Sequence, residues 1–169
     1  KQSKNKQLKV KSEDIILDIY NLNKDYKAIQ KFATDSLANT SSTERKNNLS
    51  QIKEEAHFSQ IQIDTASADA NKKIETLLAF SNEHKDSKLS KEALWQSISL
   101  AYSNGLEVKG ADLSLKYYSK FPQDPKNLDS IKEAIKAYTE AGYISQSIQT
   151  LKELAKLDPK NSYSHLQTS

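Results

Sequence analysis

The residues of this chain best suited to metal chemistry are its three histidines, at positions 57, 84 and 165. A zinc-binding helix needs two histidines one turn apart with a glutamate between them, because that spacing places both imidazoles on one face. Glu54, Glu55 and His57 reproduce only part of this pattern, since no second histidine follows at the required offset. We therefore expect these side chains to be solvated on a helix surface, and we predict neither a metal site nor a cofactor.

The other residue patterns that carry catalysis are also missing. Cysteine is absent, which excludes disulfides, thiolate-held zinc, thiolate nucleophiles and iron–sulfur clusters. No Gly-x-Ser-x-Gly turn presents a serine, and Gly105 and Gly110 precede no phosphate-binding Gly-Lys-Ser/Thr. The carboxylates are scattered, mostly beside lysines, as in solvated ion pairs on helices. The sequence predicts a protein that is not an enzyme.

The composition favours helices in thin layers. Of 169 residues only 3 are Gly and 3 are Pro, 28% are charged and 36% are hydrophobic. Few helix breakers and a low apolar fraction suit a two-layer helical assembly better than a thick globule. No apolar run approaches the roughly 20 residues that span a bilayer. We therefore predict an all-α fold.

Positive charge is concentrated at the N-terminus. Five lysines precede the first acidic residue, although the net charge of the whole chain is only +3. They are Lys1, Lys4, Lys6, Lys9 and Lys11. A nucleic-acid-binding protein carries its basic face on the fold itself, so we predict no nucleic-acid partner. We interpret residues 1–11 as a basic flexible tail, either solvated or lying against an anionic membrane surface.

Residues 12–67 carry two apolar stripes with alternating steps of three and four, the 3.5-residue repeat of a coiled-coil seam. We expect one helix from Ser12 to about Asn39 and a second one started by a capping box of Ser41 and Glu44. Together they predict a long antiparallel helical hairpin. The stripes are Ile15, Ile19, Leu22, Tyr26, Ile29 and Ala33, then Leu49, Ile52, Ala56, Ser59, Ile63 and Ala66. They are either hairpin core or an exposed seam for a partner helix.

Residues 68–169 show helix–turn–helix repeats with a period of about 34 residues, and the clearest copies are residues 92–123 and 128–161. In the second copy Gly142 lies at the turn, where a positive φ ends a helix without Cβ strain. Before these copies the seam loses register near residues 67–71. Residues 43–82 therefore fit either one helix with a phase change or two helices.

The second copy resembles the tetratricopeptide repeat family. That family's pattern takes a small residue, a Tyr, a turn Gly, a second small residue, two large apolar residues and a Pro. The matching residues here are Ala134, Tyr138, Gly142, Ser147, Leu151, Leu154 and Pro159. The first copy is similar, with Trp95 at the position that prefers Trp. The resemblance implies stacked hairpins, in which small residues let paired helices approach and large ones fill between neighbours.

The link Phe80-Ser-Asn-Glu-His-Lys-Asp-Ser, followed by Glu92-Ala-Leu-Trp, is similar to links in bacterial envelope proteins of the outer-membrane assembly and cell-division-coordinator type. Lys85 stands near the place of the expected Pro. The chain contains no Met, so we expect that a leader was removed or the chain trimmed before Lys1. The resemblance implies a periplasmic, outer-membrane-associated lipoprotein whose only membrane attachment is a lipid-anchored N-terminus. A cytoplasmic location is the alternative.

Stacked hairpins leave a concave face lined by the first helix of each pair. Two lysines one turn apart on that face would contact a carboxylate of an extended peptide. The expected groove residues are Gln96, Leu100, Ser103, Lys132, Lys136 and Thr139. We predict a non-catalytic protein–protein interaction adapter that docks a peptide or helix of another protein there. The alternatives are a homo-oligomer formed by the N-terminal helices and a cytosolic scaffold.

Overall fold

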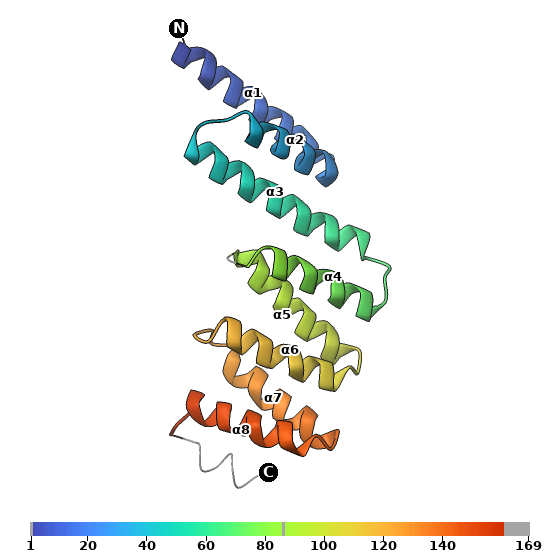
Figure 1. The fold of residues 1–169 in the computed structure, drawn as a ribbon. Helices are drawn as coiled ribbons and strands as arrows, with labels where there is room; N and C mark the ends of the chain where they lie inside the picture. The colour runs from blue at the N-terminus through green and yellow to red at the C-terminus, as the bar shows by residue number, and fades with distance from the viewer. Residues whose placement is uncertain (1, 86, 161–169) are drawn as a thin grey trace. The chain divides into compact units, whose positions relative to one another are not determined.

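The structure is a computed structural model that describes residues 2–85 and 87–160. Every regular element in these ranges is an α-helix, which confirms the all-α prediction. The chain divides into two compact units, residues 1–67 and 68–169. The first holds α1 (Gln2–Leu22), α2 (Tyr26–Ala38) and α3 (Thr43–Asp64). The second holds α4 (Ala70–Glu83), α5 (Lys88–Ser103), α6 (Glu107–Lys120), α7 (Asn127–Glu140) and α8 (Ile144–Leu157), labelled in Figure 1.

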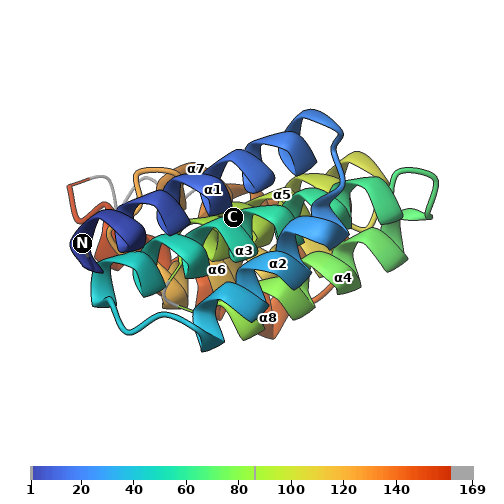
Figure 2. The same ribbon diagram turned by 90° about the horizontal axis from the view of Figure 1, so that it is seen from above.

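The first unit contains three helices, and the prediction of a two-helix hairpin over residues 12–67 is wrong. The chain reverses direction between α1 and α2 (Figure 2), at Lys24, whose φ is 54°. The Asp25 N–H donates to the Tyr20 carbonyl at 2.9 Å, which closes the end of α1. The Asp25 carboxylate then accepts from the Ala28 N–H at 3.0 Å and starts α2. The heptad pattern runs unbroken across this turn, so periodicity did not reveal it.

Two further boundaries differ from the prediction. Helix α1 begins at Gln2, so the expected flexible tail over residues 1–11 is helical from residue 2 onward. Lys, Gln and Leu are good helix formers, and like charges spread along an exposed helix do not prevent it from forming. At the start of α3, Ser42 rather than Ser41 is the N-cap, with its hydroxyl 3.4 Å from the Arg45 N–H.

The core of the first unit lies between α2 and α3, with one contribution from α1. Its buried members are Leu17, Ile29, Ala33, Leu49 and Ala56. Four of these belong to the predicted seams, but the α1 residue that reaches the core, Leu17, does not. The α1 members of the predicted seam face outward instead.

Residues 43–82 form two helices, which answers the question that the sequence left open. Helix α3 ends at Asp64, and the Asp69 carboxylate accepts from the Lys72 N–H at 3.0 Å to start α4. As the N-cap of α4, Asp69 has an extended backbone conformation. A single helix therefore cannot run through this residue from α3 into α4.

In the second unit, consecutive helices from α4 to α8 pack side by side (Figure 1). Helices α4, α6 and α8 each have 14 residues and begin 37 positions apart. Gly105 and Gly142, also 37 positions apart, have φ of 70° and 76° and form the tight turns inside the pairs α5–α6 and α7–α8. The repeat period is thus 37 residues rather than the predicted 34.

Aromatic side chains hold the first of these pairs together. The fully buried Tyr117 ring of α6 lies 5.3 Å from the Trp95 ring of α5 and 5.2 Å from the Phe121 ring. The Lys126 ammonium lies 4.3 Å from the centre of the Trp95 ring, in cation–π contact. In the next layer the Tyr138 hydroxyl donates to the Asp112 carboxylate at 2.6 Å and so joins α7 to α6.

Candidate protein-binding site

The six predicted groove residues lie on α5 and α7. On α5, Gln96 and Leu100 are half-buried and Ser103 is exposed. The Gln96 amide donates to Glu92 at 3.1 Å, Leu100 packs against the core of the second unit, and the Ser103 hydroxyl donates to the Leu100 carbonyl. These groups therefore already have partners within α5 or the core beneath it.

On α7, Lys132 and Lys136 are exposed one turn apart, as the prediction requires. The Lys136 ammonium lies 3.9 Å from Glu133. Thr139 is less available, because its hydroxyl donates to the Ile135 carbonyl at 2.8 Å and lies 2.7 Å from the Ser147 hydroxyl. The ammonium groups of the two lysines are thus exposed, as contact with a peptide carboxylate requires. Docking of a peptide on this face remains a prediction.

A serine–lysine cluster joins α4, α5 and α6, and no motif in the sequence predicts it. The Lys120 ammonium donates to the Ser90 hydroxyl at 2.7 Å and to the Ser81 carbonyl at 2.9 Å. Both serines are at most 1% exposed, so a substrate could not reach them as nucleophiles. The ammonium instead pairs with a carbonyl in the last turn of α4, where the helix dipole favours a cation. Its role is structural.

A hollow of the first unit lies between α1 and α3. It has a volume of about 470 Å³ and adjoins a second one of about 250 Å³, with which it shares Leu17, Asp18 and Ile52. We call the two together the α1–α3 groove. Its lining is Val10, Asp14, Leu17, Asp18, Asn21, Tyr26, Ile29, Thr40, Ser42, Glu44, Arg45, Asn48, Ile52, Glu55, Ala56 and Ser59.

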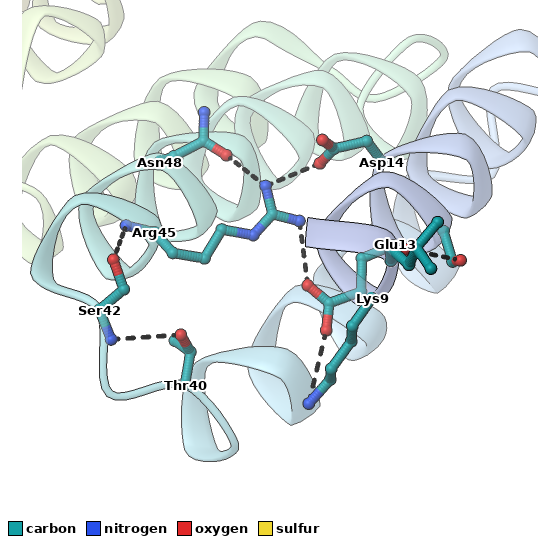
Figure 3. Close-up of polar contacts among 9 residues, drawn as sticks. Lys9, Glu13, Asp14, Thr40, Ser42, Arg45 and Asn48 are labelled. Atoms are coloured by element: carbon teal, nitrogen blue, oxygen red, sulfur yellow. Dashed lines mark hydrogen bonds and ion pairs between the residues drawn. The ribbon is translucent and has the colours of Figure 1, made fainter. Parts of the chain in front are cut away.

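Arg45 bridges the walls of this groove (Figure 3). Its guanidinium lies 3.1 Å from the Glu13 carboxylate and 2.7 Å from the Asp14 carboxylate, and it donates to the Asn48 amide oxygen at 3.0 Å. Its side chain is only 10% exposed. Two carboxylates of α1 therefore neutralise this cation and hold the first turn of α3 against α1.

The rest of the groove is apolar below and acidic above. Leu17, Ile29 and Ala56 are buried in its floor. The rim carries four carboxylates. Arg45, the only basic residue among the lining, pairs with one of them, Asp14, and so Asp18, Glu44 and Glu55 leave a surplus of negative charge. An apolar floor beneath carboxylates is complementary to a side that combines apolar and basic groups. This rim is visible only in the structure, because its acids come from two separate helices.

A second apolar surface lies on the outer side of α1. Leu8, Ile15, Ile19 and Leu22 are between 50% and 82% exposed, and we call them the α1 stripe. They follow one another at steps of seven, four and three, with the exposed Ser12 at the missing position. The opposite side of the helix carries Leu17, which is 5% exposed. The α1 members of the predicted seam are thus exposed rather than part of the core, and a partner helix for them remains a prediction.

Within the described residues, no helix combines the length and the apolar content needed to cross a membrane. Comparison with known proteins found no matching family model, no matching curated protein and no matching solved structure.

Proposed function

We propose that this chain is a non-catalytic protein–protein interaction adapter that holds a basic amphipathic helix of a partner protein in the α1–α3 groove. The observation that carries the proposal is the groove's composition, with a buried apolar floor under a rim where Asp18, Glu44 and Glu55 carry negative charges that Arg45 does not neutralise. An amphipathic helix binds such a groove through its apolar side. Basic residues at the edges of that side would face the rim.

The shape of the groove favours an elongated partner. Its two hollows share Leu17, Asp18 and Ile52, so the lined surface follows α1 and α3 over several turns. The side chains that a helix presents at successive turns fit such a surface better than a compact small molecule does. The rim carboxylates would also speed the encounter with a basic partner and reject an acidic one.

The proposal extends to the second unit, which we infer to be a pair of tetratricopeptide-like hairpins. In support, Ala134, Tyr138, Ser147, Leu151 and Leu154 are buried, as the family pattern requires. The α5 and α7 face with Lys132 and Lys136 would then take an acidic, extended peptide. The proposed place of action, the periplasmic side of a bacterial envelope in assembly or cell division, rests only on the resemblance of residues 80–95.

The test uses two synthetic helical peptides of about 18 residues, roughly 27 Å long, one with Leu and Lys faces and one with Leu and Glu faces. Fluorescence anisotropy would measure the binding of each labelled peptide to the full chain. We expect the Lys peptide to bind and the Glu peptide not to. We also expect the affinity to fall as salt is raised, because the rim charges are exposed.

Charge reversal at the rim locates the site. Glu44→Lys and Glu55→Lys should each weaken binding of the Lys peptide about fivefold or more. The matched control is Asp35→Lys, the same charge change at an exposed α2 position outside the groove. Equal loss in all three variants, or equal binding of both peptides, would contradict the proposal.

A further inference from the structure

We propose that α1 pairs in antiparallel orientation with α1 of a second copy of this chain, through the α1 stripe. The stripe lies on the side of α1 opposite Leu17, so this pairing leaves the floor of the α1–α3 groove untouched. The two surfaces share one residue, Asp18, which lies at the rim of the groove and beside the stripe.

The apolar side chains of the stripe are strongly exposed. Leu8 is 55%, Ile15 59%, Ile19 50% and Leu22 82% exposed. Four large apolar side chains in one line on a helix, interrupted only at Ser12, are a surface of the kind that marks an interface. Their steps of seven, four and three are those of the inward positions of a coiled coil, so the matching partner is another helix with the same spacing.

The charges beside the stripe select the orientation of the pair. Lys9 and Lys11 are exposed before residue 12 and Asp18 is exposed after it, whereas Glu13 and Asp14 are paired with Arg45. Two parallel copies would place each basic segment against the basic segment of the other copy. Two antiparallel copies place each basic segment beside Asp18 of the other copy, which is attractive.

The register of the pair also follows from the spacing and charges of α1. If Leu8 faces Ile19 of the second copy, then Ser12 faces Ile15, and the same contacts recur by symmetry. In this register Lys11 of each copy lies beside Asp18 of the other copy, because Lys11 and Asp18 are on the same side of the stripe. The symmetric dimer therefore contains this ion pair twice. The register shifted by one heptad places Asp18 against Asp18 and is repulsive. Charge complementarity therefore favours the first register.

The pairing should be weak but readily measured. The aligned segment from Leu8 to Ile19 spans about 17 Å, which is short for a coiled coil. Ser12 interrupts its apolar layers, and its hydroxyl donates back to the Leu8 carbonyl at 2.9 Å. Replacing it with leucine fills the missing layer, so Ser12→Leu should tighten the dimer about tenfold or more.

The experiment measures the mass of the full chain by sedimentation equilibrium over a range of concentrations. We expect a dimer that dissociates on dilution. Lys11→Asp and Asp18→Lys should each weaken it about tenfold, because each sets like charges opposite one another. An equimolar mixture of the two variants should regain the dimer, since the introduced aspartate of one chain then faces the introduced lysine of the other. Lys31→Asp and Asp35→Lys, at exposed α2 positions, are the matched controls and should change nothing.

Crosslinking tests the orientation directly, because the chain has no cysteine of its own. A mixture of Leu8→Cys and Ile19→Cys chains should form a disulfide-linked heterodimer under mild oxidation, whereas Leu8→Cys alone should not crosslink. Crosslinking of Leu8→Cys with itself would show a parallel pair and overturn the proposal.

Two other outcomes also overturn it. One is a monomer at every concentration. The other is a monomer in solution that binds vesicles of anionic lipid through the stripe, which Ile19→Lys would abolish. Circular dichroism of each variant should match that of the wild type, so that loss of the dimer is not mistaken for unfolding. Retention of Lys-peptide binding by Ile19→Lys would separate this surface from the groove.

Discussion

The ring of Tyr102 occupies the space into which a Cβ at Gly110 would project. Such an atom would lie 2.8 Å from Cε1 and Cζ of the ring, closer than packed carbons approach. The equivalent positions of the second pair, 37 residues later, are Thr139 and Ser147, whose hydroxyls lie 2.7 Å apart. The contact between α5 and α6 thus pairs a large side chain with a glycine, which has no side chain. The contact between α7 and α8 pairs two small polar side chains.

This relationship predicts the effect of Gly110→Ser. The added side chain should destabilise the second unit by about 1–2 kcal/mol, because overpacking outweighs the helix propensity gained on replacing glycine. Adding Tyr102→Thr should remove the clash, so the two changes should couple by about 1 kcal/mol in a double-mutant cycle. Urea unfolding followed by the fluorescence of Trp95, the only Trp of the chain, measures both. Strict additivity of the two changes would show that the ring moves aside freely.

The turn between α1 and α2 predicts a stabilising substitution. Lys24 has a φ of 54°, in the left-handed region, where a Cβ costs roughly 1 kcal/mol. Lys24→Gly removes that strain at some cost in unfolded-state entropy, and should stabilise the first unit by about 0.5 kcal/mol. Hydrogen exchange of the α2 and α3 amides measures the change. Lys27→Gly, inside α2, is the control and should destabilise by about 1 kcal/mol. Faster exchange in Lys24→Gly would contradict the prediction.

The cluster around Lys120 predicts a loss of stability in the second unit. Lys120→Met leaves the Ser81 carbonyl without its charged donor, and should cost about 1–3 kcal/mol of unfolding free energy. Lys116→Met is the control on the same helix, because its ammonium makes only an exposed contact with Asn82 at 3.4 Å. Trp95 fluorescence in urea compares the two. Equal midpoints would mean that the half-buried Lys120 ammonium makes no net contribution to the free energy of unfolding.

Asp124 predicts how the second unit responds to acid. Burial of its carboxylate opposes ionisation, but the Lys91 ammonium, the Lys126 N–H and the Tyr117 hydroxyl outweigh it and hold its pKa below the ordinary value. The folded state therefore binds this proton less readily than the unfolded state. The stabilisation is complete above the unfolded pKa of about 3.9 and is lost as pH falls toward the folded pKa.

Asp124→Asn should accordingly lower stability at neutral pH and flatten its fall in acid. The measurement is the urea midpoint by Trp95 fluorescence between pH 7 and 3. Asp129→Asn, at an exposed position, should keep the slope of the wild-type chain. An unchanged acid slope in Asp124→Asn would assign the acid sensitivity to other carboxylates.

What the sequence by itself determined was local. Few helix breakers predicted an all-α chain, and Gly142 predicted a turn, because a left-handed backbone conformation disfavours other residue types. Of the apolar residues in the α7–α8 pattern, Ala134, Tyr138, Leu151 and Leu154 proved to be buried, whereas Ile144 and Ile148 are 57% and 51% exposed. The period of 37 residues was not predicted, because the lengths of the loops between helices leave no periodic signal in the sequence.

Tertiary structure alone decided which side of each helix is covered. The heptad spacing of Ile15 and Ile19 is the same for a buried seam and for an exposed one, because periodicity shows only that side chains share a face. The pairing of Arg45 with Glu13 and of Lys120 with Ser90 joins residues 30 or more positions apart. Such contacts depend on how the helices pack. The acidic rim of the α1–α3 groove and the exposure of the α1 stripe are therefore seen only in the folded structure.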